Sequence, residues 1–210
     1  MKFRIDLKII IFLIVFYLSN QIEIYLMVMG FALLHELAHL IIGMILGFKP
    51  QEIELMPFGF YITLIPKVED YNKHILKSNM VGLKYIFVAL VGPLLNLILI
   101  IILGYTNLRF KQEMIYANLI LLILNLIPIY PLDGGRIFQS IFRIFLGKKT
   151  ADKSINILNN ICIILLTIAA SIAILYFKNI AILFILIYLW ILVINENKKY
   201  ELKCRNLYTC

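Results

Sequence analysis

Charged residues are scarce in this sequence. They make up 15% of its 210 residues, whereas about a quarter is typical of soluble domains, and 62% of the residues are hydrophobic. The mean hydropathy is correspondingly high, at +0.94. This composition excludes a soluble globular protein and predicts an integral membrane protein that contacts the lipid bilayer.

Cysteine and histidine are also rare, with three residues of each. The spacing of Cys162, Cys204 and Cys210 offers neither a metal-ligand pair nor a disulfide framework. A cleavable signal peptide is not expected, because no small-residue cleavage site follows the first apolar run. The net charge of +8 does not require nucleic acid as a partner, because loops near anionic lipid headgroups are commonly basic.

Six apolar segments predict an all-α membrane protein with about six transmembrane helices. Most segments approach the roughly 20 residues that cross about 30 Å of hydrocarbon. They run Leu7–Leu18, Ile22–Leu46, Leu83–Leu103, Met114–Tyr130, Ile155–Phe177 and Ile180–Ile194. The first is short. It spans only if Phe3 and Ile5 are included, and the alternative is one half of a re-entrant hairpin.

The distribution of basic residues predicts the orientation. With a cytoplasmic amino terminus, 17 of the 20 Lys and Arg residues lie on the cytoplasmic side. Only Arg109, Lys111 and Lys178 fall on the other side. This asymmetry follows the positive-inside rule, so both termini are expected in the cytoplasm of a multi-pass protein of the cell membrane.

His35-Glu36-Leu37-Ala38-His39 lies inside the second apolar segment. Histidines four residues apart share one face of a helix and can bind one zinc ion, and the intervening Glu36 is placed to activate a water molecule. Ionisable side chains are costly within a bilayer and are usually kept there for function. The pattern therefore predicts an intramembrane metal site with Glu36 as the catalytic base.

A catalytic zinc site needs a third protein ligand, and Asp133 is the best candidate. It follows an apolar run in the context Pro128-Ile129-Tyr130-Pro131-Leu132-Asp133-Gly134-Gly135, where prolines and glycines interrupt the helix. Irregular backbone at membrane depth is tolerated where it lines a cavity or is buried in protein. Taken alone, Asp133 would be read as the N-cap of a following helix, and the incomplete metal motif favours ligation.

Asn125, about two helical turns before Asp133, has two interpretations. It is either a helix-packing amide or a hydrogen-bond donor that positions the substrate carbonyl.

Together these motifs resemble the site-2 protease family of intramembrane zinc metalloproteases. The resemblance rests on His35–His39, on the run from Asn125 to Gly135, on Gly92-Pro93-Leu94-Leu95-Asn96 and on Met56-Pro57-Phe58-Gly59. It implies that His35, His39 and Asp133 bind zinc, that Glu36 is the base and that Asn125 positions the substrate. It also implies a short membrane-associated β-hairpin after the second helix, and the β-forming residues of Ile53–Ile65 permit one. An extended substrate could add to the edge of such a strand, and the alternative is a partly buried loop with no substrate role.

The layout is similar to the sporulation branch of that family, whose protease processes a membrane-tethered sigma-factor precursor. This similarity implies a membrane-tethered protein substrate, and inhibitory membrane proteins as further partners. It also implies a location in the membrane around the forespore, with both termini in the mother cell. We expect one polytopic protease domain over residues 1–195 and a short cytoplasmic tail over 196–210 that is too small for a nucleotide-binding domain.

Two other functions compete with an intramembrane endopeptidase. Intramembrane His and acid residues also line ion paths, so a metal transporter is one alternative. However, the sequence shows no internal repeat, and its polar groups concentrate at one point. The second alternative is a non-catalytic relative that holds membrane proteins, against which the complete set of ligands and base argues.

Overall fold

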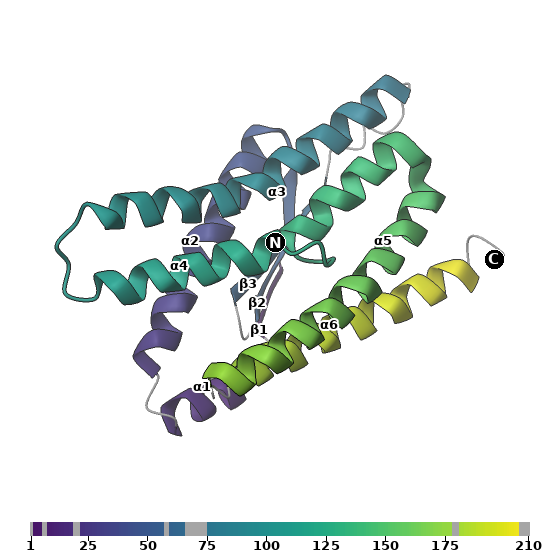
Figure 1. Ribbon diagram of the computed structural model, residues 1–210. Coiled ribbons are helices and arrows are strands. Elements are labelled where there is room, and N and C mark those ends of the chain that lie inside the picture. Colours follow the sequence, from purple (N-terminus) through teal and green to yellow (C-terminus); the bar gives the residue numbers. More distant parts are fainter. Residues whose placement is uncertain are drawn as a thin grey trace. The chain divides into compact units, whose positions relative to one another are not determined.

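The structure is a computed structural model that describes residues 2–5, 8–18, 22–56, 59–65, 75–177 and 181–205. The chain divides into two compact units, Met1–Asn125 and Leu126–Cys210. Its helices are α1 (Lys8–Leu18), α2 (Ile22–Ile45), α3 (Ile75–Gly104), α4 (Lys111–Leu126), α5 (Asp133–Phe177) and α6 (Ala181–Lys203) (Figure 1). Its strands are β1 (Lys2–Ile5), β2 (Lys49–Met56) and β3 (Gly59–Ile65).

The prediction of a mostly helical membrane protein with a β-hairpin after the second helix is confirmed. Strands β2 and β3 pair antiparallel, from Lys49 opposite Ile65 to Met56 opposite Gly59. Pro57 and Phe58, which belong to the predicted loop motif, lie outside the described residues. β3 also packs against α2, where Gly43 allows the Leu64 side chain to approach closely.

The amino terminus differs from the prediction. Residues Lys2–Ile5 form β1, which pairs parallel with β2, so the sheet has the order β1-β2-β3. Phe3 and Ile5 are therefore extended and do not lengthen the first helix. The 11 residues of α1 span only about 17 Å, at 1.5 Å per residue, well short of the hydrocarbon thickness.

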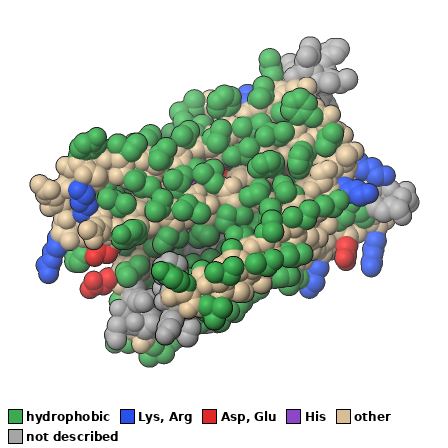
Figure 2. Space-filling model, viewed as in Figure 1, with side chains coloured by type: hydrophobic (Ala, Val, Ile, Leu, Met, Phe, Trp, Pro, Cys, Tyr) green, Lys and Arg blue, Asp and Glu red, His purple; other side chains and the backbone are tan. Residues whose placement is uncertain are grey.

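Three of the described helices are long and apolar enough to cross a membrane, namely α2, α3 from Asn79, and α5. α4 has only 16 residues, or about 24 Å of helix. The count of six spans consequently stays a prediction. Figure 2 shows hydrophobic side chains over most of the visible helix surfaces, with charged side chains near helix ends. A surface of this kind fits a lipid environment.

In the second unit, α5 is two helices joined at Gly147. This glycine has φ 78° and ψ 167°, a conformation that interrupts the helix and that L-residues with a side chain rarely adopt. The break separates the basic helix before Gly147 from the apolar run Ile155–Phe177. α5 and α6 lie side by side (Figure 1) around a core of Ile129, Ile163, Leu189 and Val193.

The last helix extends beyond the predicted end of the membrane domain. α6 continues to Lys203, and Asn197 donates a hydrogen bond to Asn160 on α5 (2.9 Å). The first part of the predicted polar tail is thus helical and packed against α5. The division at residue 195 stays a prediction.

Candidate metal centre

His35 and His39 lie on one face of α2 and face each other. Their Nε2 atoms are 3.1 Å apart, and their rings are nearly perpendicular, at 82°. Both side chains are buried, with 2% and 1% of their surface exposed. Because the two residues are one turn apart on the same helix, the sequence spacing places their side chains next to each other.

Each histidine has a partner on α3 for its other ring nitrogen. His39 Nδ1 donates to the carbonyl oxygen of Val88 at 2.7 Å. His35 Nδ1 lies 3.0 Å from Nδ2 of Asn96. Since a backbone carbonyl only accepts, His39 carries its proton on Nδ1, which leaves the Nε2 lone pair for a metal. An acceptor of this kind orients metal-binding histidines in proteins.

Gly92 leaves open the space in front of the two Nε2 atoms. A Cβ added to Gly92 would overlap Nε2 of both His35 and His39. A glycine lets α3 approach α2 closely at this point, which membrane helices commonly exploit. Because residue 92 has no side chain, the space beside Nε2 of His35 and His39 stays open, and we call this space the cradle.

The histidine pair fits zinc in donor type and separation. Two imidazole nitrogens bound to one tetrahedral zinc, each at about 2.0–2.1 Å, lie about 3.3 Å apart. The observed Nε2–Nε2 distance of 3.1 Å is close to that value. Glu36, the predicted base, adjoins His35 on α2 and is half-buried.

The second unit contains Asp133, the predicted third ligand. It is the first residue of α5, and only 3% of its surface is exposed. Nη1 of Arg136 lies 3.7 Å from its Oδ1. The first turn of a helix favours a carboxylate, so this position suits both an N-terminal capping role and a role as a ligand. Its assignment as a ligand stays a prediction at this point.

The turn before Asp133 is fixed by a hydrogen bond to α5 and by close contacts within its own backbone. Tyr130 N–H donates to Oδ1 of Asn159 at 2.9 Å, and Asn159 is buried. A Cβ added to Gly134 would overlap the carbonyl oxygens of Leu126 and Ile127, and one on Gly135 would overlap the backbone of Ile129 and Tyr130. The two glycines are therefore required for close packing of the turn on itself.

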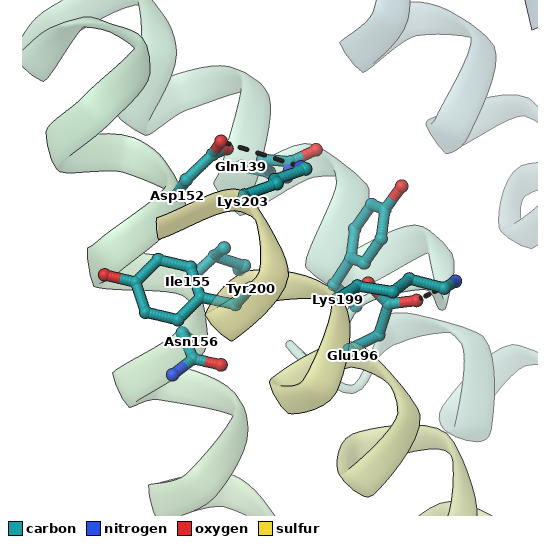
Figure 3. A pocket seen from close by; sticks show the side chains of 9 residues that line it. Gln139, Asp152, Ile155, Asn156, Glu196, Lys199, Tyr200 and Lys203 are labelled. Atoms are coloured by element: carbon teal, nitrogen blue, oxygen red, sulfur yellow. Dashed lines mark hydrogen bonds and ion pairs between the residues drawn. The ribbon is translucent and has the colours of Figure 1, made fainter. Parts of the chain in front are cut away.

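A polar cavity of about 130 Å³ lies beside this turn, within the second unit (Figure 3). It is lined by side chains of α5 and α6, and by Tyr130. Its charged groups pair with one another: Lys203 with the buried Asp152, and Lys199 with Glu196. Arg143 also bonds to Asp152, at 3.2 Å. The two pairs that share Asp152 tie the two halves of α5 to the end of α6, whereas the Lys199–Glu196 pair lies within α6.

Asn125 occupies the last turn of α4 and is half-buried. From the sequence, Gly92 and Asn96 belong to a motif in which neither has a predicted role, and Asn159 has no predicted role in supporting the turn. Asn96 had a usable signal, because an amide four residues after a glycine in an apolar helix lies on the same helix face. Nothing in the sequence connects Asn159 with the turn at Tyr130.

Comparisons with known proteins agree with these features. Residues 105–169 match Peptidase family M50. The chain is 25% identical over 155 residues to stage IV sporulation protein FB of Bacillus subtilis, covering 71% of this chain and 50% of that protein. It is 29% identical over 113 residues to a zinc metalloprotease of Methanocaldococcus jannaschii, covering 51% of this chain and 31% of that protein. The chain thus spans half or less of the length of these relatives.

The fold is matched by a solved structure, the site-2 protease from Methanocaldococcus jannaschii. The TM-score is 0.68 at 23% identity, over 93% of this chain and 91% of the other. The resemblance predicted from the motifs is confirmed: residues 105–169 of this membrane protein are similar to Peptidase family M50, and its fold is that of the site-2 protease structure.

Proposed function

We propose that this chain is a zinc-dependent endopeptidase that cleaves a membrane-tethered protein within or near its membrane segment. The observation that carries the proposal is the buried pair of Nε2 atoms 3.1 Å apart, facing the space that Gly92 leaves open. The M50 match and the relative named as a zinc metalloprotease support the same chemistry.

The proposed ligands are His35, His39 and Asp133. All three side chains are buried, and each is of a type that binds zinc. Three protein ligands leave one position for water, as a hydrolytic site requires. Zinc bound there would polarise the scissile carbonyl and make water a stronger nucleophile.

Glu36 is the proposed general base. It takes a proton from the attacking water and delivers it to the leaving amide nitrogen. Asn125 is proposed to hold the substrate carbonyl through its amide group. The role of Glu36 needs water to reach a buried site, and the basic loops support access from the cytoplasmic side, where both termini are also proposed to lie.

Substrate binding is proposed to use the edge of β3. A peptide bond in a transmembrane helix is shielded by its own hydrogen bonds, so a substrate has to become extended before cleavage. β3 is at one end of the sheet order and packs against α2, the helix that carries the histidines. An extended substrate segment can add to that edge by main-chain hydrogen bonds.

The similarity to a stage IV sporulation protein supports a sigma-factor precursor as the substrate. The proposed location is then the membrane around the forespore, with both termini in the mother cell. Inhibitory membrane proteins are proposed as further partners, because an unregulated membrane protease would damage other proteins.

The test is co-expression of the chain with candidate membrane-tethered substrates, followed by immunoblotting for the cleaved product and by zinc analysis of the purified chain. Wild type should cleave, and Glu36→Gln should abolish cleavage while zinc stays bound. Glu23→Gln, the same change at an exposed position of α2, should cleave like wild type. Equal processing by wild type, Glu36→Gln and Asp133→Ala would refute the proposal.

A further inference from the structure

We infer that Asn96 is a positioning residue that selects the metal-binding tautomer of His35, by presenting its amide oxygen to the Nδ1–H group. The inference deepens the proposed function and rests on it in one respect only, the binding of a metal by His35.

Asn96 is suited to this role by its burial and by its contact. It lies on α3, one turn after Gly92, and its side chain is fully buried. Nδ2 of Asn96 is 3.0 Å from Nδ1 of His35, a contact between residues 61 positions apart. Oδ1 of Asn96 has no hydrogen-bond partner within the described chain.

The tautomer of His35 depends on which amide atom faces it. A metal bound at Nε2 needs the lone pair of that nitrogen, so the ring proton must be on Nδ1, and Nδ1–H then needs an acceptor. Asn96 presents Nδ2, a donor, which suits the opposite tautomer. The oxygen and nitrogen of an amide have nearly the same shape, so their assignment follows from the hydrogen bonds and not from the outline of the group.

A half-turn of the amide resolves this conflict. It brings Oδ1 to the position 3.0 Å from His35 Nδ1, and it breaks no bond that Oδ1 makes within the described chain. In the resulting bond, Nδ1–H of His35 donates to Oδ1, so Nε2 of His35 carries no proton. The bond to the Val88 carbonyl has the same effect on Nε2 of His39.

The two histidines are thus held in different ways. The Val88 carbonyl accepts only, so it supports one tautomer of His39. The Asn96 amide can pair with either tautomer of His35, and it gains a bond to the metal-binding form only by turning. A side chain at residue 96 that only accepts should therefore favour metal binding, and an apolar one should weaken it.

Asn118 provides a matched control. It is a fully buried asparagine in the same unit, on α4. Its Nδ2 donates to the Met114 carbonyl oxygen at 2.9 Å, and its Oδ1 is also unpaired within the described chain. A substitution at residue 118 consequently repeats the change in burial and polarity made at residue 96, without an imidazole as the partner.

The experiment measures zinc affinity of the purified full chain in detergent by competition with a chelator, and the visible spectrum of bound cobalt(II) as a second readout. Asn96→Leu should weaken zinc binding by about 10- to 100-fold, the range typical of lost partners of metal ligands. Asn96→Asp, which has the same shape and offers only oxygen, should bind zinc at least as tightly as wild type, with the cobalt spectrum retained. Asn118→Leu and Asn118→Asp should not change the affinity.

Three results would overturn the inference. If Asn96→Asp binds zinc as weakly as Asn96→Leu, then Asn96 acts as a hydrogen-bond donor to His35 and not as an acceptor. Unchanged affinity in Asn96→Leu would show that His35 needs no partner there. If both Asn118 variants weaken zinc binding as much as Asn96→Leu does, then the loss in Asn96→Leu comes from disturbed packing and not from the contact with His35. Zinc binding is measured without cleavage, so a wild type that binds zinc and cleaves no substrate would contradict the proposed function alone.

Discussion

The two units hold their candidate ligands by different means. In the first unit, His35 and His39 are carried by a regular helix, and groups on a facing helix orient their rings. In the second unit, Asp133 ends an irregular turn, and the backbone of that turn is held by Asn159 and by close glycine contacts. The first arrangement is fixed by helix spacing and hydrogen bonds, and the second by the shape of the turn.

The largest effect is expected from filling the cradle in the first unit. In Gly92→Ala, the added methyl group overlaps Nε2 of both histidines, so zinc binding should be lost. The measurement is the zinc content of the purified chain after dialysis. Gly30→Ala, where a Cβ meets nothing within 4 Å, should keep the wild-type content. A Gly92→Ala variant with full zinc content would show that the metal does not bind in this cradle.

The carboxylate of the second unit should matter somewhat less, because His35 and His39, the other two proposed ligands, remain without it. Asp133→Asn removes the negative charge and keeps the shape, and we expect zinc affinity to fall by at least about 100-fold, because loss of a mere supporting partner already costs about 10- to 100-fold. Asp152→Asn is the control, since Asp152 is equally buried, at 3% exposed. If the two variants bind zinc equally well, then Asp133 serves as a helix cap and not as a ligand.

The turn itself is tested through Asn159. Asn159→Leu leaves the Tyr130 N–H without its acceptor, and because this bond is part-buried the loss should lie near the lower end of the about 1–3 kcal/mol that a buried unpaired N–H costs. The free energy of unfolding in mixed detergent should fall by that amount. Asn160→Leu, which removes a bond between two half-buried side chains, should cost less than the loss of the fully buried Asn159 side chain. A larger loss at Asn160 would show that the contact between α5 and α6, and not the turn, dominates this region.

The difference between the units also explains why the candidate site residues of each unit could be recognised in the sequence. The spacing of His35, Glu36 and His39 translates directly into one helix face, so their placement followed from the sequence. Asp133 stood out because prolines and glycines surround it within an apolar chain. In both cases the signal was local along the sequence.

The features that escaped prediction depend on contacts between distant segments. The Asn96–His35 contact joins residues 61 positions apart, and the Tyr130–Asn159 bond joins residues 29 apart. β1 was missed because its four residues precede an apolar run and acquire their partner only from β2. Without coordinates, nothing selects these partners among many similar residues.

The smallest effect is expected from the ion pairs beside the turn. Nζ of Lys203 lies 3.7 Å from Oδ2 of Asp152, and its side chain is 49% exposed. Water and salt screen such a pair, and Arg143 continues to neutralise Asp152 when Lys203 is replaced. Lys203→Ala should therefore lower the free energy of unfolding by less than about 1 kcal/mol, and the loss should shrink further in about 1 M salt.

The same unfolding measurement on Lys203→Ala and Asn159→Leu decides what holds the turn. If the free energy of unfolding falls little and in a salt-sensitive way in Lys203→Ala, and falls more and independently of salt in Asn159→Leu, then the neutral hydrogen bond and backbone packing hold the turn. A loss of several kcal/mol in Lys203→Ala would instead make the buried carboxylate of Asp152 the anchor of the second unit. The turn would then be held by the ion pairs of Arg143 and Lys203 with that carboxylate, and not by Asn159.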